Sequence, residues 1–586
     1  MNFIDRLNNA IDVEYDSKNA EVDELMLLPV EERVLKGDAV ADVTVNFIPM
    51  LTSNGKIYFE RAMVSCKQNI SKFREGSPVL LVGHGYTFSL NIAEDNDEAM
   101  LLEVGWQNSS VPEALNNKSG WRLETDKVDI RNIVKKSTSI LQNDLLKNKL
   151  LSGMFDGSIV PQLSAQMLSR GAQLAKETNL NPTQQQAFAN AYATENYFLI
   201  QGPPGTGKTL LLAHLALQFA KEGKKVLITA FTHTAINNAL QKARAISGFS
   251  NIFKVGKKSD AKNLNIEGAK VQNITDFRNS GFDNNSRGLI VGATCYAPFT
   301  NKLEFMDWDV VIIDEAGQMS IPLAIAAMVK GKKYILIGDH KQLPPIISDK
   351  QKDLIFRKSI FEHLFQFSAG IMLNTTYRMN AAINAFPSKQ FYNGRLLPDK
   401  SNENQLLEID NHFTLNELIL DVTKPEVLIC HNQTGFDTRS EFEAALIAKI
   451  VAQYLRKGVS AKEIAIITPF RAQVRQINKA LAKLLNDALI KQDLFVDTVE
   501  RIQGQERDVV IFSLSISDPF KVKQRTDFFF NPNRLNVALT RSKKKRIVIA
   551  HKALFEFKTN DPDLLPLVKN FTDFYDASTK IMEYEL

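Results

Sequence analysis

The spacing of hydrophobic residues divides the chain into a β-rich region, a helical region and a long α/β region. Apolar and polar residues alternate at Val43, Val45 and Phe47, which predicts short, half-buried strands near the N-terminus. From Ile130 onward, apolar residues recur every three or four positions, which predicts amphipathic helices. After about residue 178, short continuous apolar runs alternate with helical segments, a pattern typical of buried parallel strands in α/β domains.

These changes of period predict an α/β fold with accessory parts before it. The predicted parts are an N-terminal helical segment (1–40), a small β-barrel (41–110), a helical stalk (111–178), a first α/β domain (179–370) and a second α/β domain (371–586). Residues 251–285 lack strong apolar periodicity and carry several lysines. We therefore expect them to form a small helical insertion in the first α/β domain.

The strongest chemical signal is a glycine-rich loop between a predicted strand at 197–200 and a predicted helix at 210–220. Its sequence, G-P-P-G-T-G-K-T, fits the pattern G-x-x-x-x-G-K-[ST], whose backbone N–H groups surround nucleotide phosphates. In such loops the lysine reaches the β- and γ-phosphates, and the hydroxyl residue binds Mg²⁺. The pattern predicts a Mg-ATP site formed by Gly202, Pro203, Pro204, Gly205, Thr206, Gly207, Lys208 and Thr209.

An acidic pair, Asp314 and Glu315, directly follows a predicted buried strand at 310–313. We expect Asp314 to hold the magnesium ion, and Glu315 to orient or deprotonate the attacking water. The ordinary alternative is an acidic turn at the end of a strand. The phosphate loop earlier in the chain favours the catalytic interpretation.

Three later residues are candidates to sense and stabilise the γ-phosphate. Gln342 ends the motif G-D-H-K-Q, whereas Arg378 in Y-R-M and Arg541 in R-L-N-V-A-L-T-R belong to the second α/β domain. Arginines supplied by a facing domain stabilise the charge on a transferring phosphoryl group. Hydrolysis would then depend on closure of the two domains. For either arginine alone, a structural salt bridge would be the commoner role.

The segment before the first strand of this region reads L-N-P-T-Q and ends at Gln184. A glutamine amide can pair with the N6/N7 edge of adenine. The same segment is also typical of a helix N-terminus, with Thr183 as the expected cap. The two interpretations are compatible.

Composition limits the remaining function classes. The chain has 586 residues, 44% of them hydrophobic and 23% charged, and its cysteines are only Cys66, Cys295 and Cys430, which disfavours a zinc module or a disulfide framework. The N-terminus lacks the features of a leader and no apolar run is long enough to span a bilayer, so we expect a cytoplasmic protein without a membrane partner. Residues 1–40 carry a net charge of −6, which leaves +11 for the rest and suits a polyanionic partner. The basic run 543–546 is interpreted as a solvated turn before the last strand.

The ordered motifs together resemble superfamily 1 helicases of the up-frameshift type, the group that includes the nonsense-mediated decay helicase and the immunoglobulin-mu-binding helicase. The resemblance covers about residues 180–550, and F-P-S at 386–388 with F-Y-N-G-R-L at 391–396 extends it. The barrel and stalk match this family in architecture more than in residues. The resemblance implies two RecA-like domains that bind ATP between them and hold a single strand across their tops, with movement 5′ to 3′.

The resemblance also implies roles for individual residues. Tyr377 would stack on adenine, Gln184 would read the adenine edge, and Glu506 would contact the ribose. The family commonly has Gln where this chain has Thr376, and often an aromatic where it has Ile502. These departures concern the coupling of the domains and not the ATPase site. Contacts to the strand would fall on Thr232, Thr294, Thr468, Pro469 and Thr498.

The predicted function is therefore a Mg-ATP-driven helicase or translocase that acts as a monomer on single-stranded RNA or DNA. One alternative is a translocase that removes proteins from nucleic acid without separating strands. Another is an ATP-gated clamp whose slow hydrolysis only resets it, although a clamp could have lost one of the hydrolytic residues that are intact here. The motifs contain no base-specific reader, which suits a sequence-tolerant motor and leaves RNA and DNA equally open.

Overall fold

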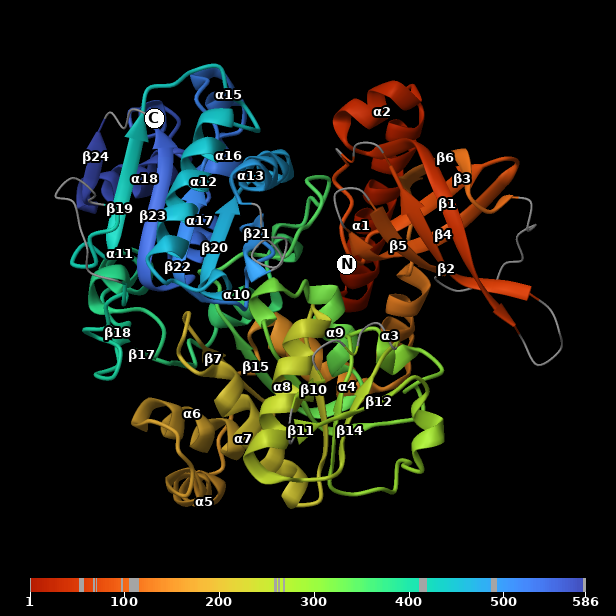
Figure 1. The fold of residues 1–586 in the computed structure, drawn as a ribbon. Coiled ribbons are helices and arrows are strands. Elements are labelled where there is room, and N and C mark those ends of the chain that lie inside the picture. The colour runs from red at the N-terminus through yellow and green to blue at the C-terminus, as the bar shows by residue number, and fades with distance from the viewer. Residues whose placement is uncertain are drawn as a thin grey trace. The chain divides into compact units, whose positions relative to one another are not determined.

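The computed structural model describes residues 2–51, 57–66, 69, 71–95, 99–104, 115–257, 261, 264–266, 269–409, 419–485 and 493–582. Contacts divide the chain into two compact units (Figure 1). The smaller unit contains residues 1–135 and 347–353, and the larger contains 136–346 and 354–586. Within the described part of the chain, no helix is both long and apolar enough to cross a membrane.

The smaller unit combines two helices with a closed β-barrel. Helix α1 (Phe3–Met26) begins at Asn2, whose side chain accepts a hydrogen bond from the Asp5 N–H at 2.9 Å, and helix α2 (Val30–Lys36) follows it. The barrel closes in the order β1-β2-β5-β4-β3-β6. Its strands are β1 (Ala39–Leu51), β2 (Ile57–Ser65), β3 (Pro78–Gly83), β4 (Tyr86–Asp95), β5 (Ala99–Val104) and β6 (Lys118–Thr125).

An aromatic cluster fills the barrel, which confirms the barrel predicted from the alternating pattern. Trp121 is fully buried, with its ring 5.6 Å from the Phe47 ring and 5.1 Å from the His84 ring. Trp121 lies on β6, which closes the barrel by pairing with both β1 and β3. The barrel thus continues past the predicted boundary at residue 110, because β6 supplies part of its core; the boundary itself lies outside the described residues.

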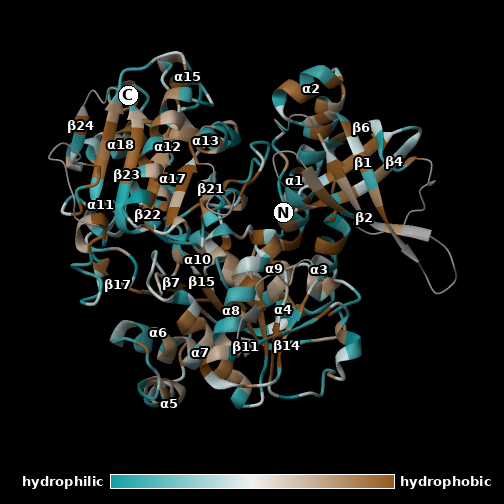
Figure 2. Ribbon diagram, in the orientation of Figure 1, coloured by the Kyte–Doolittle hydropathy of each residue, from teal (hydrophilic) through white to brown (hydrophobic). Residues whose placement is uncertain are grey.

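The larger unit begins with helices and continues into a parallel sheet. Helices α4 (Leu145–Asp156) and α5 (Ala165–Lys176) follow α3 (Arg131–Asn143), which crosses the division between the units. The sheet order is β12-β9-β13-β8-β14-β15-β7-β16, and the inner strands are largely buried and mostly apolar, whereas the edge strands β12 and β16 are partly exposed (Figure 2). Its strands are β7 (Tyr197–Gln201), β8 (Lys225–Thr229), β9 (Ile252–Val255), β12 (Gln272–Ile274), β13 (Leu289–Gly292), β14 (Trp308–Ile313), β15 (Gly331–Gly338) and β16 (Ile371–Met372). Its helices are α6 (Pro182–Ala193), α7 (Lys208–Lys221), α8 (His233–Ser247), α9 (Ile321–Met328) and α10 (Ile360–Phe365).

The segment 251–285 differs from the expected helical insertion. Its strand β9 is buried along its whole length and pairs in parallel with β13, while β12 pairs with β9. A short antiparallel pair, β10 (Asn265–Ile266) with β11 (Ala269–Lys270), lies between them. The segment therefore extends the main sheet, because four residues are enough for a buried strand but too few to show periodicity, and β9 also contains the buried Lys254.

The second α/β domain has a parallel sheet of its own, in the order β21-β20-β22-β23-β19-β24. Its strands are β19 (Glu426–His431), β20 (Ile464–Thr468), β21 (Phe495–Thr498), β22 (Arg507–Ser513), β23 (Ser542–His551) and β24 (Lys580–Met582), and a small pair, β17 (Thr375–Thr376) with β18 (Leu397–Pro398), precedes them. Its helices are α11 (Ala381–Tyr392), α12 (Glu441–Arg456), α13 (Arg471–Leu484), α15 (Pro519–Gln524), α16 (Thr526–Phe529), α17 (Pro532–Leu539) and α18 (Leu565–Ala577). The two parallel sheets confirm the predicted pair of RecA-like domains.

The basic run 543–546 lies within β23, so its interpretation as a solvated turn is wrong. Lys545 and Arg546 are almost fully buried. The Lys545 ammonium donates to the carbonyls of Asp421 at 2.9 Å and Lys424 at 2.7 Å, and Arg546 pairs with Glu426. These partners make burial of the two cations possible.

We expect Trp121→Ala to lower the free energy of unfolding of the smaller unit by about 3–5 kcal/mol, because it leaves a cavity in the barrel core. Met63→Ala is the matched control on the outside of the same barrel, where the Met63 side chain is 40% exposed. That control should cost less than about 0.5 kcal/mol. Urea unfolding followed by circular dichroism measures both, and equal losses would contradict the assignment of the core.

Candidate ATP site

Strand β7 delivers the phosphate loop at its C-terminal end, and α7 begins directly after the loop. Gly205 has a φ of 74°, in the left-handed region that favours glycine. A Cβ at Gly205 would also lie 2.5 Å from the Cβ of Arg378 and from the Thr376 hydroxyl. The Lys208 ammonium donates to the Gly202 carbonyl at 2.7 Å. The loop thus curls around its own lysine, and residues of the second domain lie directly against it.

Gln184 lies against this loop from the side of α6. Its Nε2 donates to the Thr206 carbonyl at 2.8 Å, and its Oε1 accepts from the Asn181 N–H at 2.9 Å. The Asn181 side chain in turn accepts from the Gln184 N–H at 2.9 Å, which completes a capping box. Asn181 is therefore the helix cap, and the expectation of Thr183 in that position is wrong. Recognition of adenine by Gln184 stays a prediction.

The acidic pair follows β14 and sits deep in the site. Burial, and next the neighbouring charge of Glu315, raises the pKa of Asp314 to about 7, although Lys208 opposes the shift. The Glu315 N–H donates to the Asp314 carboxylate at 3.0 Å. A buried carboxylate that is destabilised as an anion gains most from a bound cation. The donor set of Asp314 with the Thr209 hydroxyl, at the start of α7, therefore fits Mg²⁺.

Two glycines bring the acidic pair close to the G-D-H-K-Q motif. A Cβ at Gly317 would lie 2.7 Å from the Asp339 carbonyl oxygen, and a Cβ at Gly338 would lie 2.6 Å from the Gly317 nitrogen. No side chain larger than hydrogen fits at either position without a shift of the backbone. The loop that carries Glu315 is therefore held against the loop that carries Gln342.

The two arginines predicted from the second domain meet the first domain here. The Arg541 Nη2 donates to the Gln342 Oε1 at 3.2 Å, and Arg541 is almost fully buried. Burial, followed by the charge of Arg378, lowers the pKa of Arg541 to about 9. Arg378 donates to the Glu506 carboxylate at 2.6 Å and to the Thr540 carbonyl at 2.9 Å. The structure thus brings the predicted sensor and both arginines to one junction between the domains.

Glu506, for which a ribose contact is predicted, is half exposed on this junction. Burial raises its pKa, but the charge and hydrogen bond of Arg378, with Lys543 and Arg541 nearby, outweigh that effect and hold the pKa below its usual range. The carboxylate is therefore ionised at neutral pH. Its contact with a ribose stays a prediction.

Tyr377 is the exposed aromatic of the site, 43% accessible to solvent, as a platform for adenine requires. Its hydroxyl accepts a hydrogen bond from the Asn181 Nδ2 at 2.8 Å, and its N–H donates to the Gly205 carbonyl at 2.8 Å. The neighbouring Thr376 is fully buried and donates to the Pro204 carbonyl at 2.9 Å. Asn181 and Thr376 were not among the predicted site residues. The N-P-x-Q cap pattern could have indicated Asn181. No local pattern could have indicated Thr376, because its partner, the Pro204 carbonyl, lies far away in sequence.

The predicted contacts to nucleic acid lie at the C-terminal ends of strands in both domains. Thr232 follows β8 and caps α8, and Thr294 follows the adjacent strand β13. Thr468 ends β20 and pairs across the ladder with Thr498 of β21, while Pro469 comes next in the chain. Thr232 is exposed, but Thr468 and Pro469 are buried. The structure thus forms one group of these residues on each domain, and their contact with nucleic acid stays a prediction.

Comparisons with known proteins agree with this site. Residues 179–363 match one family model described as an AAA domain, and residues 356–553 match another with the same description. The human DNA replication ATP-dependent helicase/nuclease DNA2 is 29% identical over 450 residues, covering 70% of this chain and 41% of the relative. The Xenopus laevis protein of the same name is 31% identical over 400 residues, covering 63% of this chain and 37% of the relative. The chain spans less than half of the length of these curated relatives.

A solved structure of the arterivirus nonstructural protein 10 helicase aligns with 82% of this chain and 78% of its own, at 13% identity and a TM-score of 0.37. The two AAA-domain models together match residues 179–553 of this chain, and the DNA2 relatives are named as ATP-dependent helicase/nucleases. The relatives carry the DNA2 name, so the narrower up-frameshift subgroup is not confirmed.

We expect the affinity for Mg-ATP to fall as the pH drops below about 7, because Asp314 then takes up a proton and the cation needs the ionised form. The affinity falls on the acidic side because the pKa of Asp314 is raised, so the carboxyl is protonated below about pH 7 and ionised above it. Titration with a fluorescent ATP analogue at several pH values measures this. Glu315→Gln removes one cause of the shift and should move the midpoint to lower pH. The same affinity at about pH 6 and about pH 8 would contradict the assignment.

Proposed function

We propose that this chain is an ATP-dependent helicase or translocase that moves 5′ to 3′ on single-stranded nucleic acid. The observation that carries the proposal is the hydrogen bond of Arg541 to Gln342 at 3.2 Å, which joins an arginine of one RecA-like domain to the predicted γ-phosphate sensor of the other. A change at the phosphate can then alter the contact between the domains. The relatives are named as DNA replication helicase/nucleases, which favours DNA as the substrate.

In the proposed cycle, Lys208 and the N–H groups of its loop hold the β- and γ-phosphates. Thr209 and Asp314 would hold a magnesium ion, which would supply neutralising charge for the transferred phosphoryl group. Glu315 orients the attacking water and accepts its proton. Arg378 and Arg541 approach from the second domain and stabilise the developing charge, so that hydrolysis requires a closed pair of domains.

Two other functions share parts of this site. A translocase that removes proteins without separating strands would use the same ATP chemistry, and a strand-displacement assay with and without a bound roadblock protein distinguishes it. An ATP-gated clamp would hydrolyse slowly whether or not nucleic acid is present. The junction of Arg541 with Gln342 supports a motor over a clamp, because it provides the coupling that a motor needs. The up-frameshift subgroup, a monomeric state and a cytoplasmic location complete the proposal.

The test is steady-state ATP hydrolysis with single-stranded DNA and RNA of one sequence, at two salt concentrations. We expect strong stimulation by DNA, weakened by added salt because phosphate contacts release counterions. Lys208→Ala, which removes the phosphate-binding ammonium, is the control and should hydrolyse no ATP. A wild-type rate that no oligonucleotide changes would overturn the proposal.

We expect Glu315→Gln to bind ATP but to hydrolyse it at least about a hundredfold more slowly, because the attacking water loses its base while the phosphate loop stays intact. Single-turnover hydrolysis and release of a fluorescent nucleotide measure the two steps separately. The variant should also remain bound to the strand for longer in the presence of ATP. Equal rates of nucleotide release in wild type and variant would be inconsistent with this role.

A further inference from the structure

A buried carboxylate joins the phosphate loop, the sensor loop and the second domain. Asp339 is 2% exposed, and its Oδ1 accepts from the Gln201 Nε2 at 3.2 Å and from the Lys341 N–H at 3.1 Å. Its Oδ2 accepts from the Gln342 Nε2 at 3.0 Å and from the Tyr392 hydroxyl at 2.7 Å. Gln201 directly precedes the phosphate loop, and Tyr392 is the last residue of α11 in the second domain. One side chain therefore connects three parts of the ATP site.

The Tyr392 hydroxyl is itself held from a second direction. It accepts from the Asn536 Nδ2 at 2.8 Å, and the same nitrogen donates to the Lys341 carbonyl at 2.7 Å. Burial, and next the charge of Asp339, raises the pKa of Tyr392 well above its ordinary value. The phenol therefore stays protonated and donates a hydrogen bond to the Asp339 carboxylate. A short hydrogen bond from a neutral donor to a buried carboxylate is among the stronger kinds.

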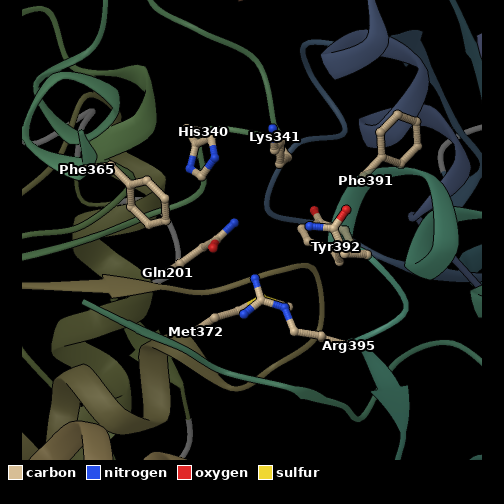
Figure 3. A pocket seen from close by; sticks show the side chains of 9 residues that line it. Gln201, His340, Lys341, Phe365, Met372, Phe391, Tyr392 and Arg395 are labelled. Carbon is tan, nitrogen blue, oxygen red and sulfur yellow. The ribbon is translucent and has the colours of Figure 1, made fainter. Parts of the chain in front are cut away.

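The domain interface beside this carboxylate is not closely packed. A cavity of about 210 Å³ lies there, lined by residues of both domains that include Gln201, Lys341 and Tyr392 (Figure 3). Packing alone therefore leaves the sensor loop room to move against the second domain. At this point the second domain holds the sensor loop by hydrogen bonds: Tyr392 donates to Asp339, Asn533 donates to the His340 carbonyl, and Asn536 donates to the Lys341 carbonyl.

The orientation of the Gln342 amide depends on Asp339. Because the Gln342 Nε2 is bound to Oδ2 of Asp339, its Oε1 is directed to the Arg541 Nη2 at 3.2 Å. The Tyr392 hydroxyl binds that same Oδ2. Two donors on one oxygen fix the carboxylate, and the carboxylate fixes the amide.

We propose that Tyr392 is a positioning residue that aligns Gln342 with Arg541 through the Asp339 carboxylate, so that closure of the second domain is transmitted to the γ-phosphate sensor. This inference rests on the proposed motor function, and it assigns to α11 a part in hydrolysis. The Tyr392 hydroxyl bonds Asp339 and Asn536, so the role proposed for it is indirect. Its effect is expected on the rate of hydrolysis and not on nucleotide binding.

The first test is Tyr392→Phe, which removes the hydroxyl and keeps the buried ring. We expect the DNA-stimulated kcat to fall at least about tenfold, the scale of one hydrogen bond to a charged group, while the KM for ATP changes less than about twofold. Tyr454→Phe is the matched control. Tyr454 is a fully buried tyrosine of the same domain, whose hydroxyl donates to the Ile419 carbonyl at 2.6 Å. A kcat equal to wild type in Tyr392→Phe, or an equal loss in both variants, would overturn the inference.

The second test places Tyr392→Phe in a Gln342→Ala background. If Tyr392 acts through Gln342, the added substitution should reduce kcat less than about twofold further, whereas a merely structural role would give the full loss again. Asp339→Asn provides an independent second variant, because it keeps the shape of the side chain and weakens the same bonds. Asp339→Asn should also lower kcat while leaving the KM for ATP nearly unchanged. The double variant of Asp339→Asn with Tyr392→Phe should be no slower than the slower of the two single variants. If the losses of kcat in the single variants add fully in the double variants, the proposed role of Tyr392 is refuted.

Failure of this inference can be distinguished from failure of the proposed function. A wild-type chain that hydrolyses ATP no faster with DNA or RNA would overturn both. A stimulated wild type with an equally active Tyr392→Phe variant would overturn only the role of Tyr392.

Discussion

The buried carboxylate of Asp339 is the contact on which the rest of the ATP site depends. Four donors from both α/β domains converge on its two oxygens. An anion in this position is stable only while these donors remain, because an unpartnered buried charge is strongly unfavourable. The requirement for partners therefore holds the strand before the phosphate loop, the sensor loop and α11 of the second domain in one arrangement. Gln342, the predicted sensor of the γ-phosphate, lies at the edge of this network.

Close backbone approaches make that arrangement possible. Gly317 and Gly338 allow the acidic loop and the sensor loop to touch, and Gly205 allows the second domain to reach the phosphate loop. The hydroxyl of Thr376 completes this last contact by donating to the Pro204 carbonyl. Thr376 thus makes a polar link between the second domain and the phosphate loop.

Much of the fold and of the candidate site follows from local patterns. Short buried runs identify the parallel strands, and contiguous motifs predict roles for Lys208, Asp314 and Glu315, since their chemistry depends on neighbours in the chain. Local patterns gave wrong predictions where a partner distant in sequence determines the burial or the pairing of a segment. Lys545 and Arg546 read as solvated, yet carbonyls and a carboxylate from other segments allow their burial. Strand β9 read as part of a helical insertion, because its pairing with β13 has no local signature.

The amino-acid sequence by itself determined the class of chemistry, because a phosphate loop, an acidic pair and two arginine motifs carry their geometry within a few residues. The tertiary structure alone decided which side chains join them. Tyr392 and Asn536 lie 53 and 197 residues from Asp339, and each also belongs to an ordinary buried helix of the second domain. Their hydroxyl and amide acquire a role only when the two α/β domains meet. The strength of a buried hydrogen bond depends on the surroundings that the whole fold creates, and no short stretch of sequence contains those surroundings.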